Sequence, residues 1–193
     1  FSASIPEHVL TGNYGQLLLR NREQMFQLIL EEKEVDRVSQ YFTLYALLFA
    51  GIYGFLLGFY SGGLQILVGA IKLPMLLFGT LLLCLPALYI FNILLGSQLS
   101  FRQTLSILLS GTYLMSTILA ALSPILFFFI LTTTNRQFIS LISLICCSIA
   151  GVFALHLVWK GMAYLSAHKG ITSNTRILRI WFIIYAIVGT QLA

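Results

Sequence analysis

The side chains that most often carry out chemistry are concentrated near the start of this sequence. All six acidic residues precede position 37: Glu7, Glu23, Glu31, Glu32, Glu34 and Asp36. General acid–base pairs, metal sites and Ser-His-Asp arrangements need a carboxylate or clustered ligands. His8, His156 and His168 are scattered, and no phosphate loop or GxGxxG pattern occurs. We therefore expect a protein that is not an enzyme, with no catalytic, cofactor-binding or metal site.

The absence of acids after Asp36 is explained by the composition. The chain is 59% hydrophobic and 9% charged, with a mean hydropathy of +0.93, whereas soluble domains carry about 25% charged residues. A carboxylate at the centre of a bilayer costs about 2.5–3.5 kcal/mol on insertion scales, but Lys and Arg can extend toward the headgroups. Residues 41–193 therefore predict an integral membrane protein, an all-α polytopic bundle of transmembrane helices.

Five apolar segments are expected to span the membrane, since a hydrocarbon core of about 30 Å needs roughly 20 helical residues. The predicted spans cover about residues 41–60, 74–96, 104–134, 137–164 and 177–193. Four spans are the alternative, if the last segment is interfacial. Residues 64–71 are too short to span and predict either a short interfacial helix or the first turns of the next span.

Three prolines should shape these spans. Pro74 is expected at a helix start, where its missing N–H is tolerated. Pro86 should kink the second span near its middle. The 104–134 segment exceeds one bilayer thickness and predicts a tilted span kinked at Pro124. Two short half-spans are the alternative, but they would leave backbone groups unpaired in lipid.

Residues 1–40 form a separate segment on the cytoplasmic side. Apolar residues recur at helical spacing from about residue 13 to 40, with charged residues mostly opposite, which predicts an amphipathic surface helix. This helix could lie on the membrane or dock on a partner. A cap folded over the cytoplasmic loops of the chain itself is the alternative.

The cations predict orientation and anchoring. With five spans, nine of the 11 Lys and Arg residues fall on one side. The positive-inside rule then places the N-terminus on the cytoplasmic side. The cations are dispersed, which favours anionic lipids over nucleic acid as partners. The expected interfacial anchors are Lys72, Arg102, Arg136, Trp159 and Lys160.

Other polar or small residues within the spans have two readings each. His156 with Lys160 suits an interfacial position better than a functional site, since no carboxylate is nearby. Asn92 could hydrogen-bond a neighbouring helix or contact a substrate. Helix packing, within the chain or against another subunit, is predicted for two small-residue stripes: Gly54, Gly58 and Gly62, and Ser143, Cys147 and Gly151.

The stretch KLPMLLFGTLLLCLPALYIFNILLG, residues 72–96, and the following SQLSFRQTLSILL resemble the Yip-domain family. These are five-span membrane proteins related to Ypt/Rab-interacting proteins, and the resemblance is to bacterial members over about residues 41–193. It implies a five-span fold with a cytoplasmic N-terminus. The acidic, aromatic motif of eukaryotic members has no counterpart here, so Rab binding is not implied.

These patterns favour a non-catalytic scaffold or accessory subunit of a larger membrane complex, with other membrane subunits and bound lipid as partners. A membrane-shaping or trafficking factor of the Yip type is the first alternative. A transporter or channel component is the second, although no inverted repeat is visible. A bacterial inner membrane or a thylakoid is the expected location, with an endomembrane as the alternative.

Overall fold

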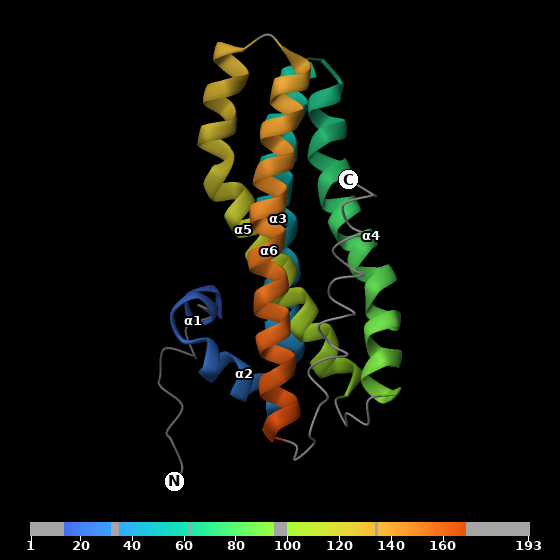
Figure 1. Cartoon of the computed structure of the whole chain (residues 1–193). Helices are drawn as coiled ribbons and strands as arrows, with labels where there is room; N and C mark the ends of the chain where they lie inside the picture. Colours follow the sequence, from blue (N-terminus) through green and yellow to red (C-terminus); the bar gives the residue numbers. More distant parts are fainter. Residues whose placement is uncertain (1–13, 32–34, 62, 95–99, 134, 169–193) are drawn as a thin grey trace.

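The computed structural model describes residues 14–31, 35–61, 63–94, 100–133 and 135–168 (Figure 1). Within these ranges every regular element is helical, as predicted. The helices are α1 (Tyr14–Arg20), α2 (Arg22–Leu30), α3 (Val35–Ser61), α4 (Gln65–Leu94), α5 (Phe101–Thr132) and α6 (Arg136–His168).

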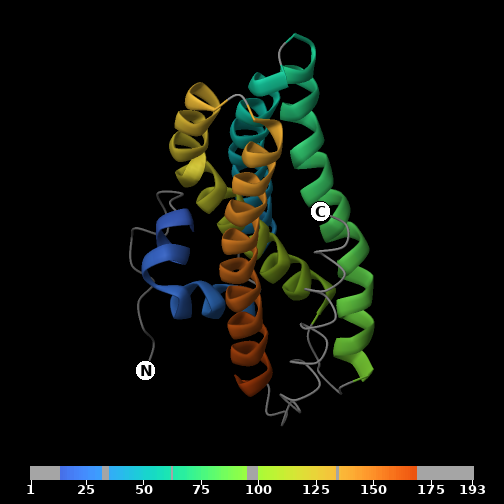
Figure 2. The ribbon, with the colours of Figure 1, turned by 45° about the horizontal axis from the view of Figure 1, so that its top comes forward.

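The long helices α3 to α6 alternate in direction and form an elongated bundle (Figure 1). α3 packs against α4 and α5, and α5 packs against α6. The short helices α1 and α2 lie beside the end of the bundle at which α3 begins (Figures 1 and 2). We call this the N-terminal end, and the end at which α3 meets α4 the far end.

Four helices of the described chain are long and apolar enough to cross a membrane. Their spanning parts are Val35–Tyr60, Gln65–Ile90, Phe101–Thr132 and Arg136–Leu165. Large apolar side chains cover their outer surface; Leu83 is 72% exposed and Val152 is 66% exposed. Such a surface suits lipid and not water, as expected of an integral membrane protein. The fifth predicted span, residues 177–193, lies outside the described residues.

The second span begins earlier than predicted. α4 is continuous from Gln65, so most of residues 64–71 form its first turns, and the prediction that Pro74 starts the helix is wrong. Residues 65–70 pack closely on α3, and this packing offsets the backbone hydrogen bond that Pro74 cannot make. α4 also continues through Pro86, where the kink stays a prediction.

The third span is one helix that changes direction along its length (Figures 1 and 2). Pro124 lies inside it and cannot donate an N–H to the carbonyl of Ala120. The Ser123 hydroxyl donates to that carbonyl instead, at 2.7 Å. Side chains of this kind commonly satisfy backbone groups that proline leaves unpaired in membrane helices. The helix begins with a capping box in which Ser100 and Gln103 satisfy each other's backbone N–H groups.

The N-terminal segment is not one continuous helix. It divides at Asn21 into α1 and α2, and Val35 already belongs to α3. Most apolar side chains of the two short helices face the protein: Leu18, Met25, Phe26 and Ile29 are at most 3% exposed, although Leu19 is 50% exposed. They join the core that α3, α5 and α6 form at this end. α1 and α2 thus pack on the long helices of the chain itself, whereas a cap over the cytoplasmic loops stays a prediction.

Candidate functional site

The backbones of α3 and α4 approach each other closely where the two helices cross. A Cβ on Gly58 would lie 2.5 Å from the carbonyl oxygen of Gln65 and 2.7 Å from Cα of Ile66. A Cβ on Gly54 would overlap the carbonyl of Gly69, and one on Gly69 would lie 2.6 Å from the carbonyl oxygen of Gly54. The two backbones can approach this closely because these positions lack side chains.

Sequence reasoning found only part of this crossing. It predicted Gly54 and Gly58, and the structure places both against α4. Gly62 lies outside the described residues. Gly69 was missed, because the sequence left residues 64–71 as either a short interfacial helix or the first turns of the next span. On a continuous α4, Gly69 lies one turn before Leu73, whose Cβ also faces the Gly54 position.

The second predicted stripe has two different environments. The Ser143 hydroxyl lies 3.3 Å from the Tyr53 hydroxyl on α3, and Cys147 packs beside the same apolar core. Gly151 differs, because no described atom beyond its own stretch of helix backbone lies within 4 Å of the position of its Cβ. Gly79, on the outer side of α4, is equally open. We call Gly79 and Gly151 the open glycines.

The interior side of α5 is polar, but its hydroxyls are already bonded. Those of Thr112, Ser116 and Thr117 donate to carbonyls one turn earlier in the helix, at 2.8–3.0 Å. Ser106 instead shares a 2.8 Å hydrogen bond with Ser39 of α3. Gln103 donates to the carbonyl of Leu30 at 3.2 Å. The last two contacts join α5 to neighbouring segments of the chain, and the other three hydroxyls are satisfied by the backbone of their own helix.

An aromatic cluster, absent from the sequence prediction, holds α1 in place. The rings of Phe42 and Tyr113 stack with centroids 5.0 Å apart, and Tyr41 packs edge-on against Tyr14 at 5.5 Å. The Tyr113 hydroxyl fills the space where a Cβ on Gly15 would be. The signal in the sequence is the aromatic run at positions 41, 42, 45 and 49, which occupies one side of α3.

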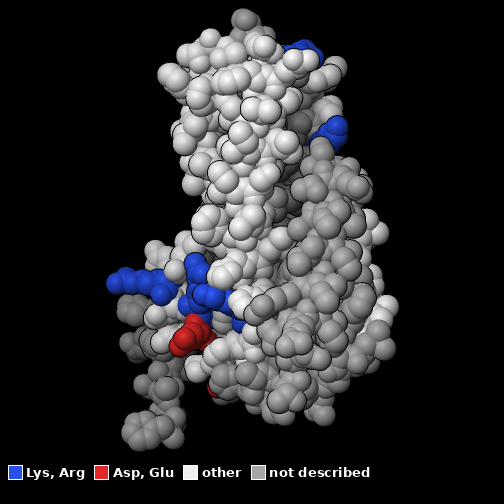
Figure 3. Space-filling view, in the orientation of Figure 1, with Lys and Arg blue, Asp and Glu red and all other residues white. Residues whose placement is uncertain are grey.

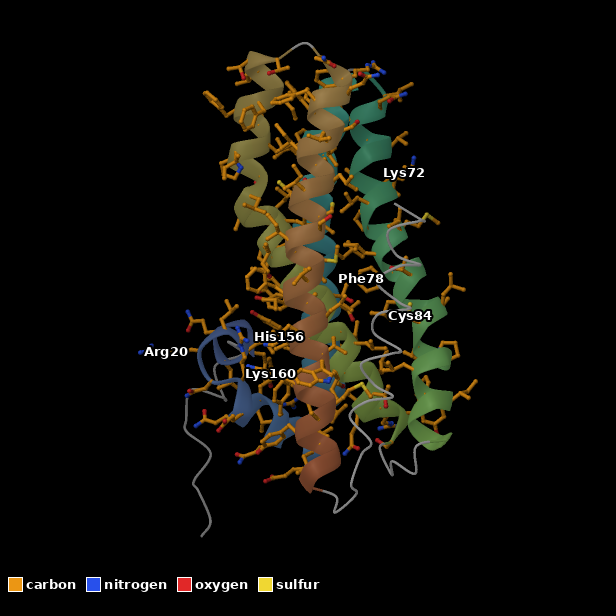
Figure 4. All side chains as sticks on the ribbon, in the orientation of Figure 1. Arg20, Lys72, Phe78, Cys84, His156 and Lys160 are labelled. Carbon is orange, nitrogen blue, oxygen red and sulfur yellow. The ribbon has the colours of Figure 1, made fainter. Side chains whose placement is uncertain are left out.

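His156 and Lys160 lie on α6 at the height of Arg20 (Figure 4), and Trp159 directly precedes Lys160 in the same helix. His156 and Lys160 are exposed, as expected near a membrane surface. Trp159 differs from a typical interfacial anchor, because its indole nitrogen is buried and has no acceptor among the described residues. An anchoring indole would present its N–H to the headgroups.

The remaining predicted residues are distributed over the two ends of the bundle. Arg102 lies 3.5 Å from Asp36 in an ion pair whose side chains are 71% and 76% exposed, so it contributes little stability. Lys72 is exposed on α4 (Figure 4), and Arg136 lies over the ring of Tyr60 at the far end. The side chain of Asn92 lies outside the described part of the structure.

The charged surface is uneven. In the view of Figure 3, Lys and Arg gather with Asp and Glu beside the N-terminal helices, whereas the upper part of the same face shows a few cations and no acid.

The three cysteines, Cys84, Cys146 and Cys147, are free thiols. Over the described ranges, no three His, Cys, Asp or Glu side chains come close enough to hold a metal ion.

No family model, curated protein or solved structure matches this chain.

Proposed function

We propose that this protein is a non-catalytic membrane scaffold or accessory subunit that packs against another membrane protein through the outer sides of α4 and α6. The observation that carries the proposal is the pair of open glycines. A glycine inside a helix costs about 1 kcal/mol relative to alanine. At Gly58 the close approach of α4 offsets this cost, but no described residue does so at Gly79 or Gly151. Small residues facing lipid are typical of positions where a second helix approaches.

The exposed side chains around these glycines support the same reading. Met75 and Leu82 flank Gly79 on α4 and are 73% and 71% exposed. Val152 and Phe153 follow Gly151 and are 66% and 55% exposed. Large apolar side chains around a small residue form a recess into which a helix of another subunit can fit.

The test begins with gentle solubilisation from native membranes, native-gel separation and mass spectrometry of the comigrating proteins. Gly79→Leu and Gly151→Leu should each remove the protein from the complex while leaving the isolated chain at least as thermally stable as before, because leucine also favours the helix over glycine. Val152→Leu is the matched control, because it enlarges an exposed side chain next to Gly151 without filling the recess. If the glycine variants unfold the isolated chain, the glycines pack within this chain and the proposal is wrong. The proposal would also be wrong if the chain, gently solubilised from native membranes, migrates alone on the native gel.

We further propose that the N-terminal end faces the cytoplasm. Most described cations lie at this end, and the positive-inside rule places the end richer in Lys and Arg on the cytoplasmic side. Asn21→Cys and Asn135→Cys, exposed near opposite ends, can be probed with a membrane-impermeant thiol reagent in sealed vesicles of known sidedness. In inside-out vesicles, Asn21→Cys should react and Asn135→Cys should not. The unmodified chain, whose cysteines lie within spans, is the control. The opposite labelling pattern would reverse the orientation.

The two alternative functions lack a supporting observation of this kind. Membrane shaping of the Yip type would use an amphipathic helix whose apolar side enters lipid, but most apolar side chains of α1 and α2 are buried or partly buried in the protein. Transport would use polar groups that are free to bind a substrate, whereas the hydroxyls of α5 are bonded to its own backbone.

A further inference from the structure

An open hollow of about 420 Å³ lies at the far end of the bundle. Its walls come from the last turns of α3 and α5 and from the first residue of α6. The lining residues are Phe59, Tyr60, Ile130, Leu131, Thr133 and Arg136.

The lining divides into an apolar part and a polar part. Phe59 and Leu131 are 45% and 64% exposed on the outer surface of spanning helices, where lipid chains would contact them. Tyr60, Thr133 and Arg136 lie where these helices end. A ligand that fits both parts has an apolar chain and a polar head, with the head at the level of the membrane surface.

The head should be anionic, because Arg136 lacks a nearby acid among the described residues. No Asp or Glu follows Asp36 in the sequence. Asp36 begins α3 and Tyr60 lies near its end, and 24 helical residues separate them by about 36 Å. Charges interact little beyond a screening length of about 8 Å at physiological ionic strength. The counter-ion of Arg136 must therefore come from outside this part of the chain.

The geometry of the arginine suits a phosphate. Its guanidinium carbon lies 5.8 Å from the centroid of the Tyr60 ring, which restrains the side chain at the edge of the hollow. A guanidinium held over a ring keeps its in-plane N–H donors available for two parallel hydrogen bonds to phosphate oxygens. We propose that this hollow binds the headgroup of an anionic phospholipid, with its phosphate on Arg136 and an acyl chain along Phe59 and Leu131.

Lys72 provides a matched control. It is also an exposed cation on the half of the bundle nearer the far end, but it does not line the hollow. If anionic lipid were attracted by charge alone, the two cations would contribute alike. A specific site in the hollow requires Arg136 to contribute far more to lipid binding than Lys72.

The experiment measures lipid binding to the full chain in detergent by native mass spectrometry and by the shift in Tm on titration. The probes are phosphatidylglycerol, phosphatidylcholine of the same acyl chains, and inorganic phosphate. Arg136→Gln should weaken phosphatidylglycerol binding about tenfold, the loss of a charge-assisted contact, whereas Lys72→Gln should leave it unchanged. Arg136→Lys should bind at an intermediate level, since it keeps the charge and loses the paired donors.

Three results would overturn the proposal. If Arg136→Gln and Lys72→Gln weaken phosphatidylglycerol binding equally, the lipid is attracted by charge in general and not by a specific site. Equal binding of phosphatidylcholine would remove the requirement for an anion. A Tm shift with inorganic phosphate as large as that with phosphatidylglycerol would identify a free anion as the ligand. If Arg136→Gln does not fold, the comparison of Arg136→Lys with Lys72→Gln decides the question.

Discussion

Glycine has opposite roles in two regions of this bundle. At the crossing of α3 and α4, Gly54, Gly58 and Gly69 lie so close to the facing backbone that a methyl group would collide with it. On the outer sides of α4 and α6, Gly79 and Gly151 face open space. The residue type and its apolar surroundings in the sequence are similar in both regions. The comparison shows that the same residue type can mark a close approach to a facing helix or lie on an open surface of the described chain.

The largest effect should follow from adding one methyl group at the crossing. Gly58→Ala places a carbon 2.5 Å from a backbone oxygen and 2.7 Å from a backbone carbon. Backbone atoms cannot move aside as a side chain does, so the free energy of unfolding should fall by about 3 kcal/mol or more. Thermal unfolding of the purified chain in detergent measures this loss. An unchanged Tm would show that α4 separates from α3 at little cost.

The same substitution at the open glycines should act in the opposite direction. Gly79→Ala and Gly151→Ala should raise the free energy of unfolding of the isolated chain by about 1 kcal/mol each, because alanine favours the helix and meets no described atom outside its own helix backbone. The measurement is the same thermal unfolding, with Gly58→Ala alongside. Destabilisation by either variant would remove the distinction between the two regions.

A smaller loss of stability is expected when a polar contact between helices is removed than when close backbone packing is disrupted. Ser106→Ala removes the 2.8 Å hydrogen bond to Ser39 between α5 and α3. Such bonds between membrane helices contribute about 0.6 kcal/mol on average, so the variant should be much milder than Gly58→Ala. Ser110→Ala is the control, since that hydroxyl bonds to its own helix at Ile107. A loss equal to that of Gly58→Ala would mean that polar contacts hold the bundle as firmly as close packing.

The smallest effect should come from the ion pair at the N-terminal end. Arg102→Gln removes a contact whose side chains are both mostly exposed. Exposed pairs contribute about 0–1 kcal/mol, and salt screens them. Tm should therefore hardly change, and any change should vanish at high salt. A large, salt-independent loss would show that Arg102 has a structural role that its exposure does not suggest.

The sequence predicted the helical class and the location of the described spans because both depend on composition. Runs of apolar residues without acids have few favourable environments other than a bilayer. The ends of α5 and α6 also lie near the predicted ones, since Ser100, Arg102 and Arg136 interrupt the apolar pattern where the helices begin. The start of α4 was predicted wrongly, because Pro74 has the local features of a helix start.

The partners of each helix were decided by the tertiary structure. Periodicity shows which residues of α1 and α2 share a face, but not whether lipid or protein covers that face, since both are apolar. Spacing shows that Gly58 and Gly151 belong to small-residue stripes, but the distance to the facing helix depends on how the chain folds back. The Ser123 hydroxyl that satisfies the carbonyl of Ala120 depends on local geometry around Pro124. The local sequence thus determined where helices form and that their surfaces suit a bilayer. Three-dimensional packing determined which of these surfaces remain available for binding.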